Sequence, residues 1–160
     1  MTKPGIEAFV ANLDNYVGNK RIGLIPNPSA VDTRLKSTLE LVTSTGKTSA
    51  LFGLEHGVRG HLQAGEKVTT GVDKQTGLPA YSLYGDTYRP TKEMLQDVDC
   101  LVFDLQDVGC RFYTYLYSLL YLLEAASEFG LPIFVLDRPN PLGAEIVSGN
   151  VLEEEYTSFV

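Results

Sequence analysis

The segment Leu101–Tyr115, LVFDLQDVGCRFYTY, constrains the fold more than any other part of the chain. It begins with an apolar run that suits a buried strand, and it ends in an aromatic stretch that suits a helix. Between them lie two carboxylates, Asp104 and Asp107, together with Gln106 and Arg111. Polar side chains where a buried strand passes into a helix are typical of ligand sites in open α/β sheets. The segment therefore predicts an α/β fold with a site at the end of this strand.

Strands and helices are predicted to alternate along the rest of the chain. Strands are predicted at residues 21–25, 48–52, 80–83, 100–105 and 133–136, with 100–105 as the central strand. Helices are predicted at 6–16, from a cap at Asp32 or Thr33 to Gly46, over one or two turns after Thr91, and at 111–129. The last helix is apolar on nearly every side, so we expect it to be buried. This order predicts a mostly parallel sheet with flanking helices and right-handed crossovers, interrupted by an irregular excursion at 58–79.

Length and charge limit the classes of function. The chain has 160 residues, enough for one domain with a sizeable core, and its net charge of −7 disfavours binding to nucleic acid or an anionic membrane. The apolar segment 116–123 is too short for a membrane span, which takes about 20 residues. Cys100 and Cys110 are isolated, so we expect free thiols rather than a zinc site or a disulfide. No signal peptide is visible, which indicates a cytoplasmic protein if Met1 is the native start.

The turn after the first predicted strand excludes the common cofactor motifs. It reads PNPSA, so it carries neither GxGxxG for a dinucleotide nor GxxxxGK[ST] for phosphates. The chain also has no HExxH zinc motif and no GxSxG nucleophile elbow. We therefore expect no cofactor and assign no metal ligands.

Four carboxylates lie at the ends of predicted strands or in the residues that follow them, namely Glu55, Asp104, Asp107 and Asp137. Because the carboxyl ends of parallel strands open on one edge of a sheet, we expect these groups to converge. Two of them also have simpler explanations. Asp107 can cap the helix that follows, and Asp137 can accept hydrogen bonds from loop amides.

Glu55 is the strongest candidate for a functional role, because a charged Glu-His pair between two glycines suits neither a strand nor a core. His56 can orient Glu55 or a substrate hydroxyl, or it can make only local hydrogen bonds. Arg111 comes four residues after Asp107 and Arg138 comes directly after Asp137, so each can form a salt bridge that holds its loop. The aromatic series at 112–117 favours a core position, although tyrosines at the mouth of a polar site also suit sugar recognition.

The polar segments at the strand ends belong to longer strings that occur in the order GLIPNPSAVD, LFGLEHGVRG, TGLPAYSLYG, VFDLQDVGCRFYTY and VLDRPNPLG. With this order and spacing, the chain resembles the DUF1343 family over residues 21–160. Characterised members of that family are exo-β-N-acetylmuramidases of the NamZ type. The departures are Leu54, where proline is usual, and Ala144-Glu145, which replace a second glycine.

The resemblance implies removal of terminal N-acetylmuramic acid from peptidoglycan fragments, in the cell envelope or outside the cell. It also implies a Rossmann-like N-terminal domain without a nucleotide, at residues 1–148, and a C-terminal domain that closes the cleft. Residues 149–160 would then be a linker or the start of that domain. The motifs carry over Glu55, Asp104 and Asp107 as catalytic residues. The residues expected to line the site and bind substrate are His56, Gln106, Arg111, Tyr113, Asp137, Arg138 and Asn140.

Glycoside cleavage needs an acid that protonates the leaving oxygen and a second group that acts as base or nucleophile. Our hypothesis is that Glu55 is the general acid and that Asp104, Asp107 or Asp137 supports the water or the oxocarbenium centre. Two other classes remain open at this point. One is a metal-assisted hydrolase that uses the three aspartates with His56. The other is a non-catalytic module that binds saccharides.

Overall fold

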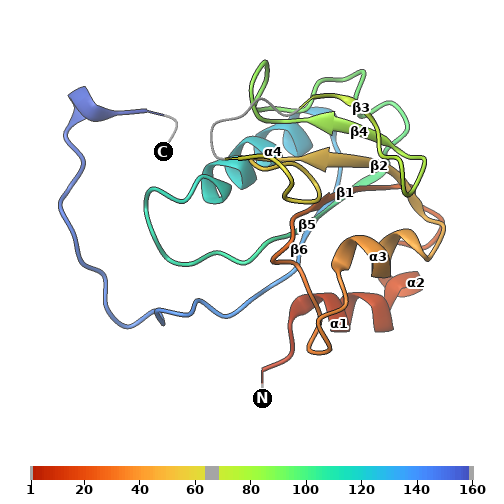
Figure 1. The fold of residues 1–160 in the computed structure, drawn as a ribbon, viewed down its shortest axis with the longest axis horizontal. Helices are drawn as coiled ribbons and strands as arrows, with labels where there is room; N and C mark the ends of the chain where they lie inside the picture. The colour runs from red at the N-terminus through yellow and green to blue at the C-terminus, as the bar shows by residue number, and fades with distance from the viewer. Residues whose placement is uncertain (1, 64–68, 159–160) are drawn as a thin grey trace.

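The computed structural model describes residues 2–63 and 69–158, which form a six-stranded sheet with helices on both faces (Figure 1). The strands are β1 (Ile22–Pro26), β2 (Thr48–Gly53), β3 (Gly71–Val72), β4 (Pro79–Ser82), β5 (Cys100–Asp104) and β6 (Ile133–Val135). Their order in the sheet is β3-β4-β2-β1-β5-β6. All neighbouring pairs are parallel except β3 and β4, which are antiparallel. The predicted α/β class with a mostly parallel sheet is therefore confirmed.

The position of β5 in the sheet differs from the prediction. The two central strands are β2 and β1, whereas β5 lies second from the edge, beside β6. The reason is the path of the chain, which builds outward from β1 to β2 and β4, and then returns to the other side of β1 for β5 and β6. The point where the strand order reverses therefore lies between β1 and β5 (Figure 1).

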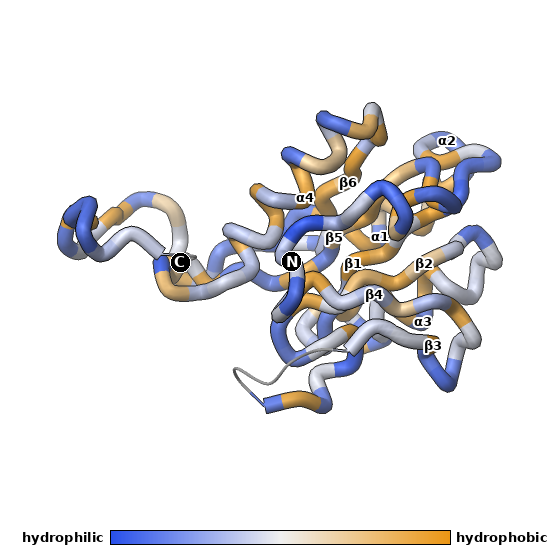
Figure 2. The backbone as a smooth tube through the Cα atoms, turned by 90° about the horizontal axis from the view of Figure 1, so that it is seen from above, coloured by the Kyte–Doolittle hydropathy of each residue, from blue (hydrophilic) through white to orange (hydrophobic). Residues whose placement is uncertain are grey.

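Helices cover the two faces of the sheet unequally. Helices α1 (Gly5–Ala11), α2 (Leu13–Tyr16) and α3 (Thr38–Thr43) lie on one face, and α4 (Tyr115–Phe129) lies on the other (Figure 1). Each inner strand supplies side chains to both faces in alternation. In β5, Leu101 and Phe103 pack on the side of α4, while Cys100 and Val102 pack on the side of α1 to α3. Burial on both faces explains why these strands are continuous apolar runs, which appear orange in Figure 2.

Helix α3 begins later than the sequence predicted. Its N-cap is Ser37, whose hydroxyl accepts a hydrogen bond from the Glu40 amide at 3.1 Å. Asp32 instead closes a local loop, in which its Oδ1 accepts hydrogen bonds from the amides of Arg34 and Lys36. Leu35, which lies within the predicted helix, sits in that loop at φ 62° with an exposed side chain. A short acidic side chain that binds nearby amides competes with helix formation, and here the loop prevails.

Two other predicted helices are also shorter than expected. The segment 6–16 divides at Asn12, whose backbone leaves the helical region and whose side-chain amide donates to the Ala8 carbonyl. The stretch after Thr91 forms turns rather than a helix, although Leu95 and Val98 are buried. A few apolar anchors can thus bury a segment that lacks the length for stable helical hydrogen bonding.

Helix α4 begins at Tyr115, not at Arg111, because the chain is still turning at Gly109, which has a left-handed φ of 70°. The helix is also less buried than its composition suggested. Leu116, Leu120 and Leu123 are 56%, 51% and 42% exposed, so this row of leucines faces outward. The buried residues Leu122, Ala125 and Ala126 supply the packing face.

The chain after β6 leaves the sheet and extends away from it (Figures 1 and 2). Residues 139–158 contain one short 3-10 helix, η1 (Glu154–Tyr156), and their side chains are exposed. The sequence-based boundary between residues 148 and 149 remains a prediction.

Both cysteines are free, and burial raises the pKa of the Cys100 thiol to about 11. None of the helices within 2–63 and 69–158 is long and apolar enough to cross a membrane.

Close packing between β1 and its neighbours can be tested at Gly23. A Cβ atom there would lie 2.8 Å from Phe52 and 2.9 Å from Leu101 and Val98, all of which are buried. We expect Gly23→Ala to lower the free energy of unfolding by about 1–3 kcal/mol through overpacking, measured by urea denaturation. Gly71→Ala is the matched control, because a Cβ at Gly71 meets nothing within 4 Å. Equal stability of the two variants would contradict the packing seen here.

Candidate functional site

The carboxyl ends of β2, β1 and β5 bring the polar segments of the sequence to one edge of the sheet. Ligands in open α/β sheets bind outside these ends, where the strand order reverses. Here the reversal lies between β1 and β5. The loops that follow these two strands touch, since the backbone amide of Gln106 donates to the Ser29 hydroxyl at 3.2 Å. Glu55 follows β2, the other neighbour of β1. The strand order therefore brings these polar segments to the edge where such sheets bind ligands, and a site there stays a prediction.

The side chain of Glu55 is held by two hydroxyl groups from distant parts of the chain. Tyr84, in the loop after β4, donates to Oε1 at 3.1 Å. Thr114, at the start of α4, donates to Oε2 at 2.9 Å. Burial, followed by the contact with the Glu55 carboxylate, raises the pKa of the Tyr84 phenol. The phenol thus stays protonated and remains a donor at neutral pH.

The backbone of Glu55 is anchored as well. The Tyr115 hydroxyl donates to the Glu55 carbonyl oxygen at 3.3 Å, and Tyr115 is also hydrogen-bonded by the buried side chain of Asn27. Asn27 in turn accepts hydrogen bonds from the amide and the hydroxyl of Ser29, at 2.9 and 2.6 Å. These contacts connect the ends of β1 and β2 with the first turn of α4. Glu55 is therefore held at both its main chain and its side chain.

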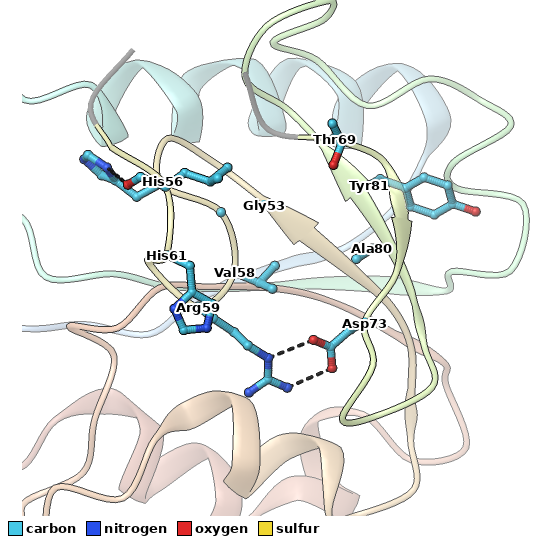
Figure 3. A pocket seen from close by; sticks show the side chains of 11 residues that line it. Gly53, His56, Val58, Arg59, His61, Thr69, Asp73, Ala80 and Tyr81 are labelled. Atoms are coloured by element: carbon cyan, nitrogen blue, oxygen red, sulfur yellow. Dashed lines mark hydrogen bonds and ion pairs between the residues drawn. The ribbon is translucent and has the colours of Figure 1, made fainter. Parts of the chain in front are cut away.

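His56 lies beside Glu55 but faces a different part of the molecule. Its φ of 69° is unusual for a residue with a side chain, and its Nδ1 lies 2.9 Å from the Leu62 carbonyl oxygen. This hydrogen bond closes the loop that follows β2. His56 also lines a pocket of about 190 Å³ between that loop and β4 (Figure 3). Glu55 is not among the described residues that line this pocket, so the two neighbours serve different surfaces.

The pocket in Figure 3 is closed at one end by an ion pair between Arg59 and Asp73. The guanidinium donates to both carboxylate oxygens, at 2.7 and 2.8 Å. This contact, with further hydrogen bonds from Thr76, holds the pKa of Asp73 well below its usual range. Asp73 also closes the turn before β4, so the pair joins the segment 58–63 to the edge of the sheet. Part of the expected excursion at 58–79 is therefore ordered by charge pairing and by the short strand β3.

Asp104, expected to be catalytic, is completely buried at the end of β5. Both of its oxygens accept hydrogen bonds from Arg138, at 2.6 and 2.9 Å, and Thr38 donates to the second oxygen as well. The Arg138 side chain is only 6% exposed. The expected salt bridge of Arg138 therefore forms with Asp104, at the end of the neighbouring strand β5, and not with the adjacent residue Asp137. The geometry of Asp104 is that of a buried, fully paired carboxylate.

Asp107 is exposed in the loop between β5 and α4. Its Oδ1 accepts a hydrogen bond from the Gly109 amide at 3.0 Å, which makes it a turn residue. The idea that Asp107 caps the helix is wrong, because the N-cap position of α4 is occupied by Thr114. Burial raises the pKa of Tyr113, and the charges of Asp107 and Glu55 raise it further, in that order. The Tyr113 hydroxyl thus lies in the electrostatic field of both carboxylates.

Gln106 and Asn140 tie the loops after β5 and β6 together. The side-chain amide of Gln106 donates to the backbone carbonyl oxygens of Asp107 and Pro139, at 2.7 and 2.9 Å. A Cβ atom at Gly109 would lie 2.7 Å from the Asn140 side chain, so the two loops approach closely there. Both residues therefore support the site edge through contacts within the protein.

Two predicted site residues lie away from Glu55. Arg111 is exposed and donates to the Asn150 carbonyl oxygen at 2.6 Å, in the extended C-terminal segment. Asp137 is exposed after the edge strand β6, where its carbonyl oxygen accepts a hydrogen bond from the Gly5 amide at 2.7 Å. Three strand spacings of about 4.8 Å separate β2 from β6, and the sheet order places β1 and β5 between them. The expected convergence of all four carboxylates is therefore not seen.

Within the described part of the chain, no three His, Cys, Asp or Glu side chains are grouped to hold a metal ion.

Sequence reasoning missed the groups that hold the carboxylates in place, namely Asn27, Thr38, Tyr84, Thr114 and Tyr115. Four of them lie in the strings that carry the family resemblance, and their positions in those strings were the signal that could have identified them. Thr38 lies outside those strings, and its role follows only from the approach of α3 to the end of β5.

Comparison with known proteins gives consistent matches along the chain. Residues 22–160 match the family model described as exo-β-N-acetylmuramidase NamZ, N-terminal. The peptidoglycan β-N-acetylmuramidase NamZ of Bacillus subtilis (strain 168) is 52% identical over 158 residues, which are 98% of this chain and 38% of that protein. Two crystal structures of DUF1343 family proteins from Bacteroides fragilis NCTC 9343 share the fold. One has a TM-score of 0.87 at 46% identity, and the other a TM-score of 0.76 at 31% identity. Each comparison covers 99% of this chain and 40% of the crystallised chain, so the chain spans about two fifths of these relatives.

The buried pair makes a prediction about stability. Arg138→Ala leaves the Asp104 carboxylate buried without its partner, so we expect the free energy of unfolding to fall by about 3–5 kcal/mol. The matched control is Arg34→Ala, because Arg34 is 81% exposed in its contact with Asp32. That change should cost less than about 1 kcal/mol. Urea denaturation of both variants measures the difference, and a loss below about 1 kcal/mol for Arg138→Ala would contradict the assignment.

The pair at the pocket predicts a pH dependence. Because the pKa of Asp73 is lower in the folded protein than its unfolded value near 3.9, the pair stabilises the fold above about pH 4. The stabilisation is lost as pH falls. We expect Asp73→Asn to cost about 2 kcal/mol at pH 7 and clearly less at pH 3, measured by denaturant unfolding at both pH values. Asp14→Asn is the control, because the Asp14 side chain is 88% exposed. A cost for Asp73→Asn that stays constant with pH would contradict this account.

Proposed function

Since the chain belongs to the exo-β-N-acetylmuramidase NamZ N-terminal family, we propose that it forms part of a glycoside hydrolase. The proposed reaction is removal of a terminal N-acetylmuramic acid from peptidoglycan fragments. The name of the Bacillus subtilis relative, a peptidoglycan β-N-acetylmuramidase, supports this substrate class. The observation that carries the proposal is the anchored carboxyl group of Glu55 at the edge of the sheet.

In the proposed mechanism, Glu55 acts as the general acid and protonates the leaving oxygen of the glycosidic bond. Glu55 is a partly exposed residue, which is compatible with access by a saccharide. Its two hydroxyl partners and the contact of Tyr115 with its carbonyl oxygen hold the group in one orientation. A fixed acid avoids much of the entropy loss that a mobile side chain would suffer on reaching the transition state.

Asp107 is the best candidate for the second carboxylate. Asp104 is buried and paired with Arg138, and Asp137 lies three strands from Glu55, so both are poorly located to act beside Glu55. Asp107 is exposed, and its charge reaches Tyr113 together with that of Glu55. We infer that Asp107 supports the attacking water or the oxocarbenium centre.

The remaining predicted residues take different proposed roles. Tyr113 packs edge-on against Tyr115, with ring centroids 4.8 Å apart, and its half-buried ring can present an apolar face to a sugar. Gln106, Arg138 and Asn140 are proposed to support the loops, because their polar groups bind other parts of the chain. His56 and Arg111 are proposed to lie at the margins of the substrate site. Neither contact described for them involves Glu55.

We also propose that a C-terminal domain of the same protein completes the cleft. The relatives are more than twice as long as this chain, which covers 38% to 40% of them. The outward-facing leucines of α4, Leu116, Leu120 and Leu123, begin close to the site. An exposed row of this kind is typical of a surface that another part of a protein covers.

The assignment of Glu55 can be tested by substitution in the full-length protein. We expect Glu55→Gln, which keeps the shape but cannot donate the proton, to lower kcat on an aryl glycoside of N-acetylmuramic acid by about 10²–10⁴-fold. Glu124→Gln, at an exposed position of α4, serves as the control and should keep normal turnover. Wild-type turnover in Glu55→Gln would refute the assignment. A folded Glu55→Gln protein, checked by circular dichroism, excludes loss of structure as the cause.

A further inference from the structure

Thr114 is in an unusual position for a threonine. It is the N-cap residue of α4, where a threonine hydroxyl ordinarily accepts a hydrogen bond from an amide of the first turn. No such bond is present at Thr114, whose own backbone is already in the helical region, at φ −61° and ψ −24°. The hydroxyl is directed instead to Glu55 Oε2, at 2.9 Å. The helix thus gives up a side-chain cap, which is typically worth about 1 kcal/mol.

Tyr84 makes the corresponding contact from the other side. It lies in the loop after β4, thirty residues before Thr114 in the chain, and donates to Oε1 at 3.1 Å. Each oxygen of Glu55 therefore has a hydroxyl partner, and the two partners come from different elements, the loop after β4 and the start of α4. Two contacts from independent elements fix the plane of a carboxyl group, whereas a single contact would leave it free to rotate.

We propose that Thr114 and Tyr84 are positioning residues that hold the Glu55 carboxyl group in its reactive orientation through the proton transfer. The inference rests on the proposed function, in which Glu55 is the general acid. It adds two residues that touch the acid but need not touch the saccharide.

Hydroxyl groups suit this task because they can both donate and accept a hydrogen bond. A carboxylate accepts from both hydroxyls, and a protonated carboxyl group can donate to one of them after that hydroxyl rotates. The raised pKa of the Tyr84 phenol, caused by burial and then by Glu55, keeps it neutral over the range in which a glycosidase works. The pair can therefore hold the acid before and after it loses its proton. A lysine or arginine in either position would instead stabilise only the charged form.

The test uses the full-length protein with Thr114→Val, Thr114→Ser and Tyr84→Phe, assayed on the same aryl glycoside across pH. We expect the Val and Phe variants to lower kcat by about tenfold, the effect of losing about 1.4 kcal/mol in the transition state, with KM within about twofold. A hydroxyl that donates to a carboxylate favours its charged form. Its removal should therefore move the alkaline limb of the pH profile upward by about half a pH unit. Thr114→Ser keeps the hydroxyl, so it should keep both the wild-type kcat and the wild-type position of the alkaline limb.

Two controls separate positioning from general damage to α4. Ser118→Ala removes a buried hydroxyl that donates to the Thr114 carbonyl oxygen at 3.3 Å, and it should change stability without moving the pH limb. In a Glu55→Gln background, Thr114→Val should cause no further loss of kcat, because the group that it holds no longer transfers a proton.

The outcomes distinguish this inference from the proposed function. An inactive Glu55→Gln together with normal kcat and pH profile in Thr114→Val and Tyr84→Phe would overturn the positioning role alone. Equal impairment of Thr114→Ser and Thr114→Val would also overturn it, since the hydroxyl would then not be the active feature. Full turnover in Glu55→Gln would overturn both ideas. If Thr114→Val does not fold, Tyr84→Phe and Thr114→Ser still decide the question.

Discussion

The edge of the sheet that carries the site depends on the buried ion pair between Asp104 and Arg138. A carboxylate without solvent is tolerated in a protein interior only when it is paired and hydrogen-bonded. Arg138 supplies two hydrogen bonds and Thr38 a third, so the requirement is met. Asp104 ends β5, Arg138 follows β6, and Thr38 begins α3. One charge therefore joins three segments that are far apart in the sequence, and the loop that carries Asp107 starts from this fixed point.

The acidic groups near this edge have separate roles because their surroundings differ. Asp104 is buried and fully paired, whereas Asp107 is exposed and organises a turn. Glu55 lies between these extremes, because it is partly exposed and its carboxylate oxygens accept hydrogen bonds from the hydroxyls of Tyr84 and Thr114. A hydroxyl can both donate and accept, so such partners can contact the carboxyl group in either protonation state. These contacts and the partial exposure are the physical basis for proposing Glu55 as the acid.

Much of the architecture could be predicted because strands buried on both faces leave a strong signal in a sequence. The apolar runs of β1, β2 and β5 were located within a residue or two, and their alternation with helices indicated a parallel sheet. Helix starts were less predictable. Asp32 and Ser37 are both good caps by residue type, and the choice between them depends on a loop in which Asp32 binds nearby amides. Likewise, Gly109 delays the start of α4 because the chain there packs against Asn140.

The sequence by itself determined the fold class and the strand ends at which polar groups gather, and it made Glu55 the leading candidate for the acid. These follow from local patterns, because burial on both faces and turns rich in glycine or proline are visible in short stretches of chain. Only the tertiary structure decided which side chains contact each carboxylate. Asp104 and Arg138 meet at the ends of the neighbouring strands β5 and β6. Asp137 follows the edge strand β6, and Thr114 contacts Glu55 from the start of α4. Such partnerships depend on strand order and on the approach of α4 to the sheet, which residue types alone do not specify.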